Sequence, residues 1–293
     1  MNKIASAHQL GPMLRLPSSK SDESLLGYIF RVGKLNGCSS LQHMYSLVGK
    51  EGMARDGGWP WLYESTPNRQ KMQVLFDGME ANWPSVVENQ LQLFGLEYPA
   101  RYIKFKYPKF CPACLAESSH HRWYWDLAHV TVCLKHQLLL MDRCLGCRKR
   151  LYWDREMLSF CACGCDWTQV DGQAVAESNE LYVTRRVLAF CGFGQQREEG
   201  SFLDTLDLVA FLDTTFFAAS LYLLSQKKWK LTLKKQNHIF HLGLTEACAL
   251  LADPPQSFFA FLDELYPDER KRILSLCKDY LGQPAGPLTA WVA

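Results

Sequence analysis

Residues 111–136 read CPACLAESSHHRWYWDLAHVTVCLKH and carry the strongest structural signal in the sequence. Cys111 and Cys114 are separated by two residues, and so are Cys133 and His136. At this spacing a tight turn, called a knuckle here, can direct two side chains at one metal ion. The loop between the two pairs is long enough to bring them together. The stretch therefore predicts a closed tetrahedral zinc site with three thiolates and one imidazole.

A second site is predicted directly downstream. Cys-Leu-Gly-Cys at 144–147 forms one knuckle, and Cys-Ala-Cys-Gly-Cys at 161–165 offers three thiols for the other. A tetrahedral ion needs only two of these three. The Cys-x-Cys-Gly order favours Cys161 with Cys163, because the following glycine lets the backbone turn, while Cys163 with Cys165 stays an alternative. The expected cofactor content is two zinc ions per chain.

The predicted metal sites are structural, and we assign no catalytic residue. Three histidines inside the first stretch could in principle serve an open catalytic site: His120, His121 and His129. Four ligands in paired knuckles nevertheless close the coordination sphere, whereas a catalytic zinc keeps one position open beside a general base. The segment has no His-Glu-x-x-His pattern. We therefore expect a protein that is not an enzyme.

Composition gives no sign of a strongly basic nucleic-acid binder, since the formal net charge of the 293 residues is +2. The N-terminus lacks the apolar core of a secretory signal, and no stretch reaches the roughly 18 apolar residues that span a bilayer. We expect a cytoplasmic protein with no membrane partner. In a reducing compartment, clustered cysteines are more often metal ligands than disulfides.

The metal-binding segment is locally basic. Residues 101–155 contain 11 Lys or Arg and four acidic residues, with Tyr and Trp interleaved. Such a face suits a nucleic acid or an acidic protein, although a solvated basic face around a small zinc core is an equal alternative. The candidate surface residues are Arg122, Lys135, Arg143, Arg148, Lys149 and Arg150. A second basic run lies at 227–235.

The rest of the chain reads as helical. Residues 19–37, SKSDESLLGYIFRVGKLNG, predict a helix capped by Ser21 or Asp22 and ended by Asn36-Gly37, and Ser39 or Ser40 can cap a second helix up to Gly49. The pair is compatible with a helix-turn-helix, but helical hairpins that only pack a core are commoner.

We predict a mainly α protein with a small zinc-knuckle or zinc-ribbon insert. Residues 69–98 should add one or two helices, short strands are expected around HVTVC and HQLLLM, and periodicity predicts several helices after residue 170. The expected domains are an N-terminal helical domain (1–100), a tandem zinc-binding domain (101–170) and a C-terminal helical domain (171–293).

The order of these motifs resembles the TniQ/TnsD family of transposon target-selection proteins. The likeness rests on SDESLLGYIFRVGKLNG, CPAC, HRWYWDL, CLKH, LLLMDRCLGC and CACGCDW, and it covers residues 20–170 well and 171–270 loosely. By this resemblance one zinc ion is held by Cys111, Cys114, Cys133 and His136, and the other by Cys144, Cys147, Cys161 and Cys163. Leu134 replaces the usual proline, and Cys165 has no counterpart.

The resemblance implies a noncatalytic adaptor that marks an insertion site and recruits the transposon's AAA+ ATPase, which brings the transposase. Some members bind attachment-site DNA directly, and others dock, often as homodimers, on an RNA-guided complex of the Cascade type. The near-neutral charge favours the docking version for this chain.

Two other classes remain as alternatives. One is a zinc-ribbon transcription regulator that reads DNA through a helix-turn-helix at 21–49. The other is an enzyme, either a zinc hydrolase or a thiol-disulfide oxidoreductase that uses Cys163 and Cys165.

Overall fold

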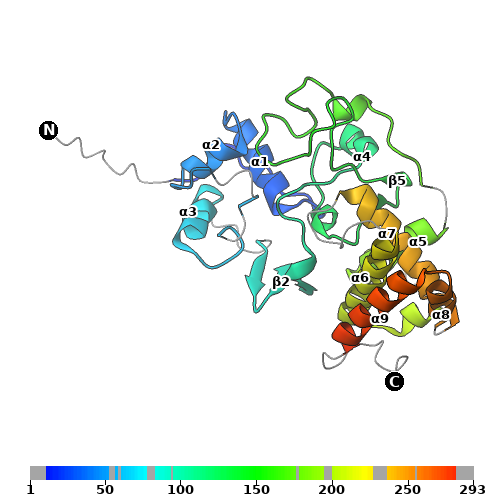
Figure 1. Cartoon of the computed structure of the whole chain (residues 1–293). Coiled ribbons are helices and arrows are strands. Elements are labelled where there is room, and N and C mark those ends of the chain that lie inside the picture. Colours follow the sequence, from blue (N-terminus) through cyan, green and yellow to red (C-terminus); the bar gives the residue numbers. More distant parts are fainter. Residues whose placement is uncertain are drawn as a thin grey trace. The chain divides into compact units, whose positions relative to one another are not determined.

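Helices make up most of the regular structure, as the sequence predicts (Figure 1). The structure is a computed structural model that describes residues 11–52, 57–58, 61–77, 83–93, 95–175, 178–194, 200–226, 236–254 and 256–281. The chain divides into two compact units. The first draws on residues 1–110, 114–126 and 143–170, and the second on residues 111–113, 127–142 and 171–293. The three-domain division stays a prediction.

The first unit begins with helix α1 (Leu25–Leu35). Its N-cap is Ser24, whose Oγ accepts a hydrogen bond from the Gly27 N–H at 3.0 Å. The predicted caps, Ser21 and Asp22, were therefore wrong. The Asp22 carboxylate is used elsewhere, because it pairs with the loop that carries His120. The predicted end of the helix is confirmed, since Gly37 has a φ of 80°, which a glycine adopts without strain.

Helix α2 (Leu41–Ser46) follows, capped by Ser40. Gly33 of α1 faces α2, and a Cβ at this glycine would lie 2.7 Å from Cγ of Met44. The missing side chain therefore allows the two helices to approach closely. The predicted helix pair is present, whereas its use in reading DNA stays a prediction.

Residues 69–98 are only partly helical, which corrects the sequence prediction. Helix α3 (Pro67–Leu75) is followed by a three-stranded antiparallel sheet in the order β1 (Ser85–Val87), β2 (Gln90–Leu93), β3 (Leu96–Pro99). The turn between β1 and β2 has positive φ at both Glu88 (49°) and Asn89 (64°), the conformation of a two-residue hairpin turn. The alternation in Gln-Leu-Gln-Leu buries Leu91 and Leu93, which is a strand pattern that helical spacing obscured.

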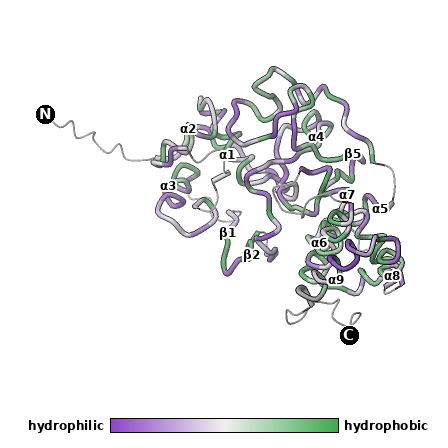
Figure 2. The backbone as a smooth tube through the Cα atoms, in the orientation of Figure 1, coloured by the Kyte–Doolittle hydropathy of each residue, from purple (hydrophilic) through white to green (hydrophobic). Residues whose placement is uncertain are grey.

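The second unit contains a short hairpin and a group of helices. The predicted strands are confirmed as the antiparallel pair β4 (Val132–Cys133) and β5 (Leu138–Leu139). The helices are α5 (Ser178–Phe190), α6 (Leu208–Ser225), α7 (Asn237–Leu250), α8 (Gln256–Asp263) and α9 (Pro267–Leu281). Hydrophobic residues recur along these helices (Figure 2). The basic run at 227–235 lies outside the described residues.

Helix α6 packs against α7 and α9. A Cβ at Gly243 of α7 would lie 3.0 Å from the Leu223 side chain of α6, so the two helices are in close contact at this point. Within the described part of the chain, α6 is also the one helix that is long and apolar enough to cross a membrane, which the sequence prediction overlooked. Half of that window is buried inside the protein, as in a core helix.

Candidate metal centres

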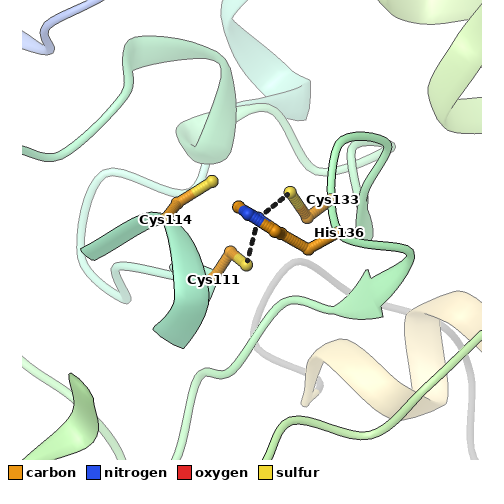
Figure 3. A group of neighbouring side chains, drawn as sticks. All are labelled: Cys111, Cys114, Cys133 and His136. Carbon is orange, nitrogen blue, oxygen red and sulfur yellow. Dashed lines mark hydrogen bonds between the residues drawn. The ribbon is translucent and has the colours of Figure 1, made fainter. Parts of the chain in front are cut away.

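The first predicted cluster is brought together by α4 and the β4–β5 hairpin (Figure 3). Cys111 directly precedes α4 (Pro112–Glu117), and Cys114 lies in its first turn. Cys133 ends β4, and His136 lies in the turn that leads to β5. The four candidate ligand atoms all lie within 4.8 Å of one another.

The distances in this cluster fit a tetrahedral ion. Nδ1 of His136 lies 3.5 Å from Sγ of Cys111 and 3.6 Å from Sγ of Cys133. Bond lengths of about 2.3 Å to sulfur and about 2.0 Å to nitrogen place S and N about 3.5 Å apart in a tetrahedron. The three thiols are buried, with exposed fractions of 0%, 2% and 6% for Cys111, Cys114 and Cys133. The group could therefore hold a metal ion that is shielded from water.

A tight turn of the backbone positions His136. Residues 134–137 form the turn of the β4–β5 hairpin, and Gln137 has a φ of 51°. Positive φ is uncommon outside glycine and marks a tight turn. The segment after Gln173 supports β5, because the Leu139 N–H donates to the Gln173 carbonyl and the Val175 N–H donates to the Gln137 carbonyl. The sequence reasoning did not identify this third segment.

The second cluster contains Cys144, Cys147, Cys161 and Cys163. Sγ of Cys144 lies 3.6 Å from Sγ of Cys163, and Cys147 and Cys161 are separated by the same distance. Two sulfur ligands of a tetrahedral zinc are expected about 3.8 Å apart. The four thiols thus also fit one soft metal ion.

Two small hairpins carry these thiols. The first is closed by an antiparallel bridge between Arg143 and Arg150, and the second by a bridge between Phe160 and Asp166. In the second hairpin the Gly164 N–H donates to the Cys161 carbonyl at 2.9 Å, and Gly164 has a φ of 86°. The predicted glycine turn is therefore present.

The environment of Cys144 favours its thiolate. Burial raises the pKa of this thiol, but a hydrogen bond from the Cys147 backbone and others from side chains lower it to about 6. Burial raises the pKa of Cys161 to about 12. The thiolate is the form that binds metal, so the lowered pKa favours the ligating form of Cys144.

The three histidines considered as catalytic ligands lie outside both clusters. His120 bonds to Asp22 at 2.7 Å, and His129 bonds to the Leu212 carbonyl at 3.2 Å. His121 bridges Ser24 Oγ (2.9 Å) and the Lys109 carbonyl (3.0 Å), and burial keeps its pKa well below the usual value. These contacts connect the histidines to the surrounding fold.

Four of the candidate surface residues lie on the first hairpin of the second cluster. Arg148 and Lys149 are exposed and have no ion-pair partner among the described residues. Arg143 Nη1 donates to the Arg148 carbonyl at 2.9 Å, and the Arg150 guanidinium lies 3.5 Å from the centre of the Tyr107 ring. Lys135 is exposed on the β4–β5 turn.

Arg122 does not share this exposure, because its residue is 8% exposed and its Nε lies 3.0 Å from Asp22 Oδ2. Several of the interleaved aromatics are likewise inside the fold, where they pack the core: Tyr102, Trp123 and Trp153. The Trp153 Nε1 donates to the Phe105 carbonyl at 3.0 Å. Within the described residues, the basic face is therefore narrower and less aromatic than the sequence suggested.

Comparison with protein-family models matches residues 14–140 to the TniQ family. The matched stretch contains α1, α2 and all four residues of the first cluster, while the second cluster lies beyond it. No curated protein matches the chain.

Proposed function

We propose that this chain is a noncatalytic adaptor for target-site selection in DNA transposition, because residues 14–140 match the model of the TniQ family. In this role it links a target-recognition element to the transposon's AAA+ ATPase and transposase. The observation that supports the proposal is the position of α1, α2 and a four-residue metal cluster within one family-matched stretch.

We assign zinc to both clusters. Sets of three or four cysteine sulfurs suit zinc better than magnesium or calcium, which prefer oxygen ligands. Bound zinc would supply structural stabilisation, since four protein ligands leave no open position for a reacting water. Cys111, Cys114, Cys133 and His136 would hold one ion, and Cys144, Cys147, Cys161 and Cys163 the other.

The target is reached either through attachment-site DNA or through an RNA-guided complex of the Cascade type. The net charge of +2 favours docking on the complex, since a protein that binds DNA by its own surface usually has a larger positive charge. A homodimer is the assembly proposed for this version, and the cytoplasm is the proposed location.

Reconstitution tests the adaptor role directly. Purified chain is mixed with a transposon AAA+ ATPase and its transposase, with and without a guide complex, and insertion at a target site is measured by sequencing. Targeted insertion that needs the chain, together with co-purification of chain and ATPase, supports the proposal. Targeted insertion that is unchanged without the chain contradicts it.

A gel-shift titration separates the adaptor from a helix-turn-helix regulator. Tight binding to one duplex by the chain alone, in the absence of transposition proteins, would favour the regulator. The short helix α2 argues against the regulator. Three of its six residues, Leu41, Met44 and Tyr45, are buried, so only the other three side chains could contact bases.

Cys114→Ser tests the first metal assignment. The serine removes one thiolate from a buried ligand set, so we expect one zinc per chain instead of two and a lower unfolding temperature. Metal content is measured by mass spectrometry after gel filtration. Cys191→Ser is the matched control, because Cys191 is a buried thiol outside both clusters and its replacement should leave two zinc ions. A well-folded Cys114→Ser protein with two ions would refute the assignment.

A further inference from the structure

Cys165 is a fifth thiol beside the second cluster, which needs only four. It lies two residues after Cys163 in the same hairpin, and the Cys161 N–H donates to the Cys165 carbonyl at 3.0 Å. The hairpin thus holds this residue close to two of the four cluster cysteines.

Gly146 shows that the opposite hairpin makes room for this thiol. A Cβ at Gly146 would lie 3.2 Å from Cβ of Cys165 and 3.5 Å from its Sγ. The same point is 3.6 Å from Sγ of Cys163. Gly146 is not among the described glycines with positive φ, so the backbone does not require a glycine here. A side chain at this position would therefore lie against Cys165 and close to both sulfurs.

The two thiols differ in exposure. Cys163 is the one exposed residue of the second cluster, whereas Cys165 is only partly exposed. The Cys165 thiol also interacts with the thiol of Cys144, which is a member of the cluster. A reagent from solvent would therefore reach Cys163 first and leave a neighbouring thiol intact.

We propose that Cys165 is a reserve ligand of the second metal site, which replaces Cys163 when that exposed thiol is lost or modified. In the exchange, the Cys163 sulfur would leave the metal and use that electron pair to bond the carbon of an alkylating reagent, whose halide departs. The Cys165 thiol gives its proton to water and its sulfur forms the new bond. The number of thiolate ligands and the charge of the site stay the same. The inference rests on the proposed second zinc ion.

Four proteins test the exchange by zinc content: wild type, Cys163→Ser, Cys165→Ser and the double variant. We expect two zinc ions in the wild type and in each single variant, and one in the double variant. One zinc in Cys163→Ser would overturn the proposal. One zinc in the wild type would instead contradict the second site itself, so the two failures are distinguishable. Cys161→Ser is the control and should contain one zinc, because Cys165 is proposed to replace Cys163 only.

Alkylation of the folded protein avoids any folding defect of a variant. Wild type and Cys165→Ser are treated with iodoacetamide, and peptide mass spectrometry locates the modified thiol while zinc release is followed with a chromogenic chelator. We expect modification of Cys163 with both ions retained in the wild type, and release of one ion from Cys165→Ser. Equal release from the two proteins would refute the reserve role.

Discussion

His241 is a buried histidine of α7, and it connects two polar side chains in the second unit. Its Nδ1 lies 3.1 Å from Thr131 Oγ1, and its Nε2 lies 3.4 Å from Glu180 Oε1. Burial lowers the pKa of His241 below its usual value, although the Glu180 carboxylate opposes this effect. The folded protein therefore holds this imidazole neutral at pH values where an unfolded chain would protonate it.

The free energy of unfolding should fall in mild acid because His241 becomes protonated. The unfolded chain takes up a proton near pH 6.5, while the folded chain does so only at a lower pH. The stabilisation is complete above about pH 6.5 and is lost as the pH falls toward the folded pKa. We expect His241→Gln to show a smaller drop in unfolding temperature than the wild type between pH 7.5 and 5.5. Calorimetry on both proteins checks this, and the comparison cancels acid effects on the thiols. Equal drops would contradict the prediction.

The N-terminus of α7 is anchored to the hairpin that carries the first cluster. The Asn237 N–H donates to Asp142 Oδ2 at 2.8 Å, so a distant carboxylate caps the helix. The Asn237 Nδ2 donates to the carbonyls of Thr131 and Leu140, each at 2.8 Å. These carbonyls flank β4 and β5, so one side chain joins the two ends of the hairpin to the helix.

Asn237→Ala should destabilise the protein by about 1–3 kcal/mol, because the buried Leu140 carbonyl loses the Asn237 donor, whereas the Thr131 carbonyl keeps its bond from the Leu140 N–H. The hydrogen bond from the Asn237 backbone N–H to Asp142 remains in the variant, so the change in free energy measures the contribution of the side chain alone. Urea unfolding monitored by circular dichroism measures the change in free energy. Gln236→Ala is the control, because Gln236 occupies the N-cap position without a capping hydrogen bond and should cost little. An Asn237→Ala variant that unfolds at the wild-type midpoint would show that the hydrogen bonds of the Asn237 side chain do not stabilise the protein.

Charge is balanced in the chain as a whole but is locally positive on the hairpin of Arg148 and Lys149. Both are exposed and lack a carboxylate partner among the described residues, which leaves their charge available to phosphates. Phosphate contacts release counterions, so their number appears in the salt dependence of binding.

Replacing both Arg148 and Lys149 by alanine should weaken binding to random duplex DNA. The slope of log K against log salt should fall by about 2 if each contacts one phosphate. Fluorescence anisotropy at several salt concentrations measures this slope. The control replaces Lys271 and Arg272 of α9, which removes the same charge from another exposed place. An identical loss in the control would mean that total charge, and not this hairpin, governs binding.

The amino-acid sequence alone was enough to predict features that depend on neighbours in the chain. The knuckle pairs, the glycine turns and helix α1 with its end at Gly37 follow from spacing within a few residues, and the resemblance to the TniQ family follows from the order of these motifs along the chain. The candidate ligand sets could be proposed for the same reason, since each half of a set lies in one short turn.

Only the tertiary structure decided which side chains distant segments bring together. Arg122 is buried and pairs with Asp22, a hundred positions away in the sequence, and the cap of α1 is Ser24 rather than Asp22. Cys163 completes the group of four because its sulfur lies within 4.8 Å of the other three, and Cys165 lies beside Gly146 of the opposite hairpin. Spacing along the chain predicts where the chain turns. Which side chains are buried or paired depends on contacts between segments that are distant in the sequence, because burying an unpaired charge costs free energy.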